Sequence, residues 1–108
     1  MLSDARSPKW IAIDMAHAHA IKVYGAPITP FGGSTYDSPD HQVARTMVNA
    51  WVRTSGRFDA VVDLDQAVAD PTTPANLAAA YDSGDHLHLT PAGYQKMADA
   101  IDLTLFTN

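Results

Sequence analysis

The sequence contains no cysteine, few basic residues and no long apolar run, and each absence excludes a class of protein. Without cysteine the chain has no disulfide, no thiolate zinc site and no cysteine nucleophile. Seven Lys and Arg residues against twelve Asp and Glu residues give a net charge of -5. Because no basic run is present to follow a line of phosphates, we expect no nucleic-acid partner.

Membrane and leader segments are not expected either. No apolar stretch approaches the roughly 20 residues that span a bilayer. Residues 1–8 lack the apolar stretch of a signal peptide. As it stands, the chain is therefore expected to be cytoplasmic and to have no membrane partner.

Helices are predicted at three places by their starting signals. Hydrophobic residues make up 46% of the 108 residues, which is enough for one domain with a core. A hydroxyl residue followed by proline, a favoured helix start, occurs at Ser7, Ser38 and Thr90. The helices are expected over residues 9–20, from 39 to near 56, and from 91 to 105. The expected core-facing stripes are Val43, Met47, Val48, Trp51 and Val52 in the second helix and Tyr94, Met97, Ala98, Ile101 and Leu105 in the third.

Two runs rich in β-branched and apolar residues, 21–26 and 58–64, are predicted as strands. A loop dense in proline and glycine, 27–39, separates the first strand from the second helix, and residues 66–84 form a long connection. Alternation of helices and strands predicts an α/β fold with three α/β/α layers and a short parallel sheet. Two strands leave two open sheet edges, so the sheet is expected to be completed by oligomerisation.

The strongest chemical signal is an aspartate three residues before a histidine, at Asp85 and His88. Directly ahead of a capped helix, this spacing can place the carboxylate against one imidazole nitrogen while the other nitrogen faces a cleft. The simpler reading is that both residues are polar loop groups that satisfy the start of the helix.

The segment 81–94, YDSGDHLHLTPAGY, resembles the C-terminal block of the SGNH (GDSL-type) hydrolases, and residues 21–31 and 58–63 look like the strands that precede it. The resemblance implies a flavodoxin-like fold and hydrolysis of carboxylic esters by a serine, a histidine base and an orienting aspartate. By motif match, Asp85 is the orienting acid and His88 the base. The family is often secreted.

The chain also departs from the family pattern. It contains no Gly-Asp-Ser block, which carries the family's nucleophile, and no Gly-x-Asn-Asp run, which carries oxyanion donors. Leu89 stands where proline is common and His86 where a small residue is common. Residues 1–108 are therefore interpreted as a single truncated domain, the C-terminal half of the family fold.

A substitute nucleophile is needed, and Ser34 is the best candidate. It follows Gly32 and Gly33 in the loop after the first strand, at the same end of a parallel sheet as His88. The two glycines would free N–H groups for an oxyanion hole. Alternatively this segment is simply a flexible turn. Ser38 is better explained as a helix cap. Ser83 is near His88 but lies in a turn, so whether its hydroxyl reaches the histidine depends on the geometry of that turn.

Two H-x-H pairs suggest a metal site, but we expect neither a metal nor a cofactor. On a helix, His17 and His19 point about 200 degrees apart and cannot chelate one ion. In an extended segment His86 and His88 would share a side, and with Asp63 or Asp65 they could make a metal site. The family resemblance nevertheless accounts better for His88.

Two functions remain. The first is a minimal esterase for small esters that uses Asp85, His88 and Ser34. The second is a catalytically inert α/β fragment that associates with itself or with a separate N-terminal half. Both predict a homo-oligomer, most simply a homodimer formed by strand pairing across a two-fold axis.

Overall fold

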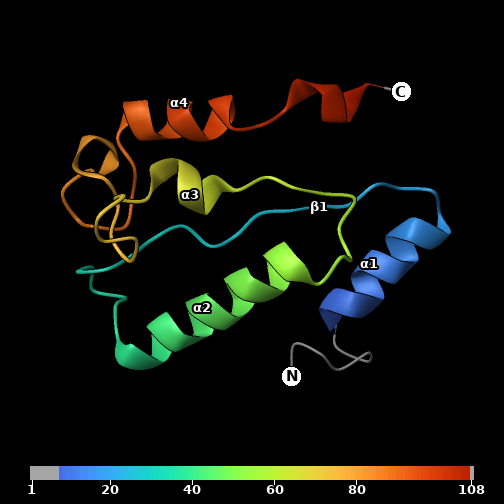
Figure 1. The fold of residues 1–108 in the computed structure, drawn as a ribbon, viewed down its shortest axis with the longest axis horizontal. Coiled ribbons are helices and arrows are strands. Elements are labelled where there is room, and N and C mark those ends of the chain that lie inside the picture. The colour runs from blue at the N-terminus through green and yellow to red at the C-terminus, as the bar shows by residue number, and fades with distance from the viewer. Residues whose placement is uncertain (1–7, 108) are drawn as a thin grey trace.

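The computed structural model describes residues 8–107, in a molecule of 42 × 34 × 19 Å. Helices alternate with two very short strands, as Figure 1 shows. The elements are α1 (Pro8–Ala18), β1 (Tyr24–Gly25), α2 (Pro39–Thr54), β2 (Ala60–Val61), α3 (Leu64–Val68), the 3-10 turn η1 (Ala79–Tyr81), α4 (Pro91–Asp99) and the 3-10 turn η2 (Leu103–Phe106).

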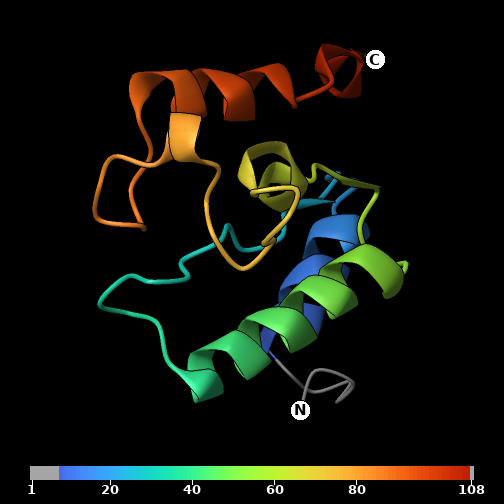
Figure 2. The ribbon, with the colours of Figure 1, turned by 60° about the vertical axis from the view of Figure 1, so that its left-hand side comes forward.

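The two strands are parallel, so the predicted mixed α/β class is confirmed. Tyr24 pairs with Ala60 and Gly25 with Val61. The helices α1 and α2 lie on one side of this pair and α3 and α4 on the other (Figures 1 and 2).

The strands are much shorter than predicted. Only two residues of each run, 21–26 and 58–64, have regular strand pairing. Backbone bonds from Asp59 N to Val23 O and from Val62 N to Gly25 O, both 2.8 Å, extend the contact slightly. A parallel strand is held by neighbours on both sides, and each strand here has one neighbour, so little of either run is regular.

Capping predictions are confirmed at two of the three helix starts. The Ser38 hydroxyl accepts a hydrogen bond from His41 N, and the Thr90 hydroxyl accepts one from Gly93 N, each at 3.1 Å. Ser7 lies outside the described residues. The loop predicted over 27–39 is also observed, since no helix or strand lies between β1 and α2.

The last helix is shorter than predicted and does not bury the predicted stripe. It ends at Asp99, and Asp102 then caps the separate turn η2 through a 2.9 Å bond from Thr104 N. Tyr94 is 54% exposed. The buried contact of α4 is Gly93, where an added Cβ would lie 3.0 Å from Cβ of Leu89 and of Tyr81. A larger residue would push these neighbours apart, so α4 packs closely through its backbone at Gly93, and Met97 is its other contact with the core.

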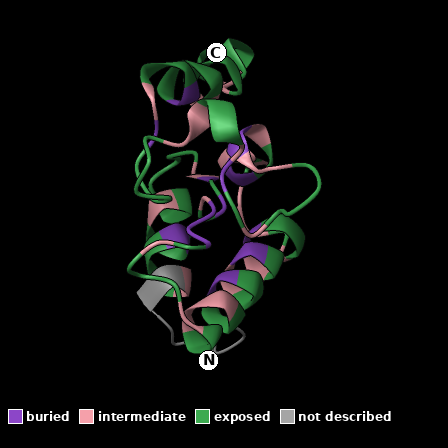
Figure 3. Ribbon diagram, turned by 90° about the vertical axis from the view of Figure 1, so that its left-hand side faces the viewer, coloured by how far each residue is buried: buried purple, intermediate pink, exposed green. Residues whose placement is uncertain are grey.

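The buried face of α2 also differs from the prediction. Arg45, Asn49 and Val52 are buried, whereas Val43 and Met47 are 59% and 50% exposed. Figure 3 shows the buried positions of α2 turned toward the rest of the chain and its outer face exposed. The reason is that two of the buried side chains, Arg45 and Asn49, form hydrogen bonds with the backbone that follows β1.

Asn49 and Arg45 both bind the backbone of Ile28. Asn49 accepts from Ile28 N at 2.7 Å through Oδ1 and donates to Ile28 O at 2.9 Å through Nδ2. Arg45 Nε also donates to Ile28 O, at 3.2 Å. The amide of Asn49 therefore replaces the neighbouring strand that this stretch of backbone lacks.

Ion pairs then join α2 to α3. The guanidinium of Arg45 donates to the buried carboxylate of Asp65, and Arg53 donates to Asp65 at 2.8 Å and to Asp63 at 2.9 and 3.0 Å. The bonds to Asp63 and Asp65 raise the pKa of Arg53, and the Arg53 guanidinium lowers the pKa of Asp63. Arg53 thus remains charged where α2 meets α3.

The apolar packing falls into two groups. One consists of Val68, Leu77 and Leu89, with Ala67, Tyr81 and Met97 against it. The other is a chain of edge-on aromatic contacts, from Trp10 to Trp51 at 5.5 Å and from Trp51 to Phe58 at 5.4 Å. The second group joins α1 to α2.

Replacing Asn49 by Ala should lower the free energy of unfolding by about 1–3 kcal/mol, because the N–H of Ile28 loses its acceptor. The check is chemical denaturation followed by circular dichroism. The matched control is Thr46→Ala on the exposed side of the same helix, where the hydroxyl only returns to Gln42 O. Its effect should stay within about 0.5 kcal/mol. Equal effects of the two substitutions would contradict the role given to Asn49.

Candidate active site

The structure brings Asp85 and His88 together. Oδ2 of Asp85 lies 2.6 Å from Nδ1 of His88. The other oxygen, Oδ1, accepts from Leu87 N at 2.9 Å, His88 N at 2.8 Å and the Ser83 hydroxyl at 3.0 Å. The carboxylate of Asp85 therefore holds both the backbone and the imidazole of His88. The hydroxyl of Ser83 donates to Asp85 and not to His88.

These bonds favour the charged carboxylate. The His88 side chain first, then the backbone N–H groups of His88 and Leu87, hold the pKa of Asp85 far below its ordinary value. A charged acceptor at Nδ1 keeps the proton on that nitrogen and leaves Nε2 as the basic position. The side chain of His88 is 68% exposed, and no described residue is bonded to its Nε2.

A second carboxylate and imidazole pair lies in the same loop. Oδ2 of Asp82 is 2.6 Å from Nδ1 of His86, and Oδ1 of Asp82 accepts from Gly84 N and His86 N at 2.9 and 3.0 Å. His86 has a φ of +63°, a region that residues other than glycine rarely adopt. The backbone bonds to Asp82 hold this conformation in place.

The sequence interpretation missed this second pair. Its signal is the spacing of four between Asp82 and His86, which overlaps the spacing of three between Asp85 and His88. His86 stood out only as a departure from the family pattern and as one member of an H-x-H pair. A spacing alone does not predict the left-handed turn that brings the His86 ring back to Asp82.

Ser34 lies in the same part of the molecule but is not bonded to His88. Its hydroxyl accepts from Tyr36 N at 3.2 Å. The preceding residue, Gly33, lies beside the other histidine, since a Cβ there would be 3.6 Å from Cδ2 of His86. The loop after β1 and the segment 82–88 thus meet at the end of the molecule that is on the left in Figure 1.

The oxyanion hole predicted from Gly32 and Gly33 is wrong. Gly32 N donates to Ala75 O at 2.7 Å, and Gly33 N donates to Asp37 Oδ2 at 2.8 Å. Both N–H groups are therefore already used to close the loop. The same bonds, with Ser34 N to Phe31 O at 3.0 Å, show that this segment is a hydrogen-bonded turn.

An apolar pocket of about 340 Å³ adjoins the segment 82–88, which carries His86 and His88 and is called the histidine loop below. Leu87, between the two histidines, forms part of its wall, opposite Phe31 and Tyr36 of the loop after β1 and Ala44 and Val48 of α2. Phe31 and Tyr36 meet edge-on at 5.2 Å, so the aromatic wall is fixed. The pocket has the character of a site for a small apolar group.

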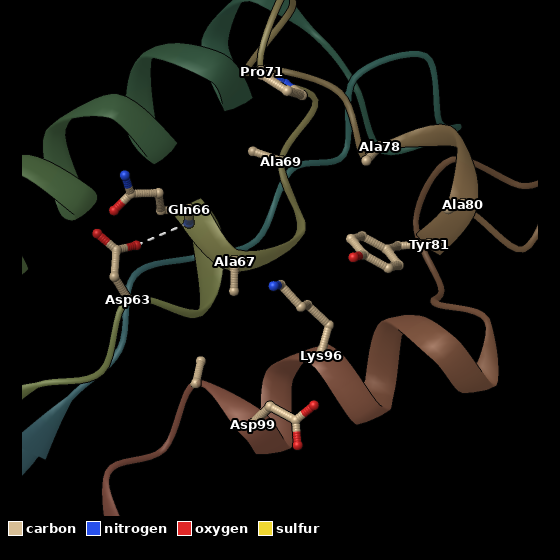
Figure 4. A pocket seen from close by; sticks show the side chains of 11 residues that line it. Asp63, Gln66, Ala67, Ala69, Pro71, Ala78, Ala80, Tyr81, Lys96 and Asp99 are labelled. Carbon is tan, nitrogen blue, oxygen red and sulfur yellow. Dashed lines mark hydrogen bonds between the residues drawn. The ribbon is translucent and has the colours of Figure 1, made fainter.

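A second pocket, of about 610 Å³, lies between α3 and α4 (Figure 4). Its lining includes Asp63, Tyr81, Lys96 and Asp99 but neither pair of aspartate and histidine. Figure 4 shows Lys96 extended toward Ala67. No histidine lines this pocket.

The remaining candidate metal ligands have other partners. Asp63 and Asp65 are bound by arginines, as described above, and His17 Nε2 lies 2.9 Å from Asp59 Oδ2. His19 Nδ1 lies 2.9 Å from Met15 O. Within residues 8–107, no three His, Asp or Glu side chains form a group that could hold a metal ion. Nor is any helix in that range long and apolar enough to cross a bilayer.

An α/β chain that presents a histidine oriented by a carboxylate, next to an apolar pocket, has the parts of a hydrolase that works by general base catalysis. The model of the GDSL-like Lipase/Acylhydrolase family matches residues 11–96, and the chain belongs to this family. Membership suggests esterase or acylhydrolase activity. No curated protein matches the chain.

Acid titration should show the depressed pKa of Asp85. Its carboxylate bonds are present above the pKa of an unfolded aspartate, about 3.9, and are lost only as the pH falls through the lower folded value. We expect the amide proton shifts of Leu87 and His88, followed by NMR, to change at lower pH than in a synthetic peptide of residues 82–90. Identical midpoints would contradict the hydrogen bonding described.

Proposed function

We propose that the chain hydrolyses small carboxylic esters with His88 as general base and Asp85 as its orienting acid. The observation that carries this proposal is the 2.6 Å contact between Asp85 Oδ2 and His88 Nδ1, which leaves Nε2 open to solvent. Family membership supports the reaction class, since the match over residues 11–96 includes both residues.

In this proposal Nε2 of His88 takes a proton as an oxygen nucleophile attacks the ester carbonyl. The anionic carboxylate of Asp85 stabilises the imidazolium that forms. Ser34 supplies the nucleophile, from a loop at the same end of the molecule, and its acyl intermediate is then hydrolysed by water. The acyl group lies in the 340 Å³ pocket beside Leu87, whose volume suits short chains.

Turnover of p-nitrophenyl acetate tests the base and the nucleophile separately. His88→Gln should lower kcat/KM by about 100-fold or more, because general base catalysis is lost. Asp85→Asn should also lower it, because the neutral amide no longer stabilises the imidazolium. Ser34→Ala should abolish the acyl intermediate.

The matched control for background imidazole reactivity is His19→Gln, which replaces an exposed histidine directly after α1 whose ring is bonded to Met15 O. Its activity should equal that of the wild type. Activity lost in His88→Gln but kept in Ser34→Ala would retain the base and reject the serine. Activity kept in both would reject the proposal.

A second candidate, an assembling fragment without activity of its own, is favoured by the exposed apolar surface. Ile11 and Met15 of α1 are 46% and 60% exposed, and Val43 and Met47 of α2 are exposed to a similar extent. Both pairs are spaced by four residues, so each helix carries an uncovered apolar stripe. Such surface is typical of a chain that binds a second copy or a separate N-terminal half.

The open edge of β1 also supports the second candidate. Val23 and Gly25 bond to the β2 side, which turns the N–H and C=O groups of Tyr24 and Ala26 to the opposite edge. No described residue bonds to these groups. Pairing of two β1 edges across a two-fold axis would join two short sheets and complete an α/β/α arrangement.

Sedimentation velocity at micromolar concentration tests the assembly. We expect a dimer, and Ala26→Pro should shift it toward monomer because proline removes one edge N–H. Thr46→Ala, on the exposed side of α2, is the control and should leave the dimer intact. A compact monomer that unfolds cooperatively at this concentration would contradict the assembly.

A further inference from the structure

We propose that the apolar pocket beside the histidine loop binds a single aromatic ring, so that the substrates are esters of compact aromatic carboxylic acids. This inference rests on the proposed function and names the substrate class of that site. The observation behind it is the group of three packed rings, Phe31, Tyr36 and His41, that lines this pocket of about 340 Å³.

The three rings are held in place by one another. Phe31 is 4% exposed, and its ring meets that of Tyr36 edge-on at 5.2 Å. The rings of Tyr36 and His41 are stacked, with their centroids 4.1 Å apart and their planes at 18°. Nδ1 of His41 also lies 2.6 Å from Tyr36 O. The aromatic part of the pocket is therefore formed before a ligand enters, which lowers the cost of binding.

The rest of the pocket wall is aliphatic. Ala44 and Val48 are four residues apart on α2 and so lie on one face of that helix, and Leu87 comes from the histidine loop. Arg45 also lines the pocket, but its guanidinium donates to Ile28 O at 3.2 Å and to the carboxylate of Asp65. Its charge is thus engaged, and the surface left to a ligand is apolar.

Large apolar side chains around this pocket are exposed to water. Ile28 is 42% exposed, Tyr36 is 54% exposed and Leu87 is 38% exposed. They come from segments far apart in the sequence and converge on one hollow. A ring bound among them would remove apolar surface of both the protein and the ligand from water, which favours binding.

The size and the walls of the pocket favour a ring over an alkyl chain. Its volume of about 340 Å³ is at the lower end of the range of about 300–1,000 Å³ for ligand sites, which suits one ring. An alkyl chain loses rotational freedom about several bonds when it binds, whereas a planar ring does not. Aromatic rings with centroids about 4.5–7 Å apart also attract one another beyond the effect of burial.

The pocket and the base are positioned by the same carboxylate. Asp85 Oδ1 accepts from Leu87 N at 2.9 Å, and Asp85 Oδ2 lies 2.6 Å from Nδ1 of His88. Leu87 is the residue directly before His88 in the sequence. A ring that packs against Leu87 therefore brings the carbonyl group attached to it to the part of the loop that carries the base.

Binding is tested without chemistry by NMR titration with benzyl alcohol and cyclohexylmethanol, two neutral alcohols that differ in the aromaticity of the ring. Both should shift the methyl signals of Leu87 and Val48, and benzyl alcohol should bind about 2- to 10-fold more tightly. Tyr36→Leu should remove this preference, because it replaces a ring of the wall by an aliphatic side chain. Tyr36→Phe should retain it. Thr46→Ala, on the exposed side of α2, is the control and should bind both alcohols like the wild type.

Turnover tests whether the bound ring is the acyl group. The values of kcat/KM for p-nitrophenyl benzoate and p-nitrophenyl cyclohexanecarboxylate are each divided by the rate constant with free imidazole, which corrects for the reactivity of the ester. The benzoate should then be favoured about 2- to 10-fold, with loss of the preference in Tyr36→Leu and retention in Tyr36→Phe. Ala44→Leu should raise KM for the benzoate more than for p-nitrophenyl acetate, because the longer side chain takes up part of the pocket.

The outcomes separate this inference from the proposed function. Equal binding of the two alcohols, or methyl signals of Leu87 and Val48 that do not move, would overturn the inference even when p-nitrophenyl acetate is hydrolysed through His88. Tighter binding of benzyl alcohol without turnover of any ester above that of free imidazole would overturn the proposed function and the substrate class with it, since the bound ring would then not be an acyl group.

Discussion

The backbone of Ile28 leaves β1 without a second strand beside it, and the side chains of α2 satisfy it. Asn49 binds both its N–H and its C=O, and Arg45 adds a third bond while its guanidinium reaches the buried carboxylate of Asp65. This polar contact sets the rotation of α2, because a buried backbone group without a partner costs more than an exposed apolar side chain. The exposure of Val43 and Met47 is the consequence.

The same contact positions the candidate site. The loop that follows Ile28 carries one wall of the apolar pocket and, beyond it, the turn with Ser34. The turn is closed by its own bonds to Ala75 and Asp37, and Gly33 in this turn lies beside His86. The histidine loop is therefore held by two carboxylates from within and by the loop after β1 from outside.

Much of this could be predicted from the sequence where the signal is local. The caps at Ser38 and Thr90 and the contact of Asp85 with His88 each depend on residues three apart, and all three are observed. The extent of the strands and the buried face of α2 could not be predicted. Both depend on which neighbours are present to pair with a strand or to receive a side chain, and periodicity contains no such information.

The oxyanion prediction failed for a related reason. The glycines beside Ser34 predict free N–H groups. In the structure these N–H groups donate to the carbonyl of Ala75, which is distant in the sequence, and to the carboxylate of Asp37, which is near. The pair of Asp82 and His86 was missed because its ring position depends on a backbone turn at positive φ. Local spacing thus predicted contacts within a turn and failed where a second segment decided the outcome.

Under the proposed function, solvent exposure limits what the two imidazoles of this loop can do. Both imidazoles are more than half exposed, at 68% for His88 and 54% for His86. In water, a carboxylate at 2.6 Å stabilises an imidazolium far less than it does in a site from which water is excluded. A second chain would strengthen general base catalysis only where it covers the loop with the two imidazoles. Activity that rises more steeply than protein concentration would therefore indicate that association excludes water from these two rings.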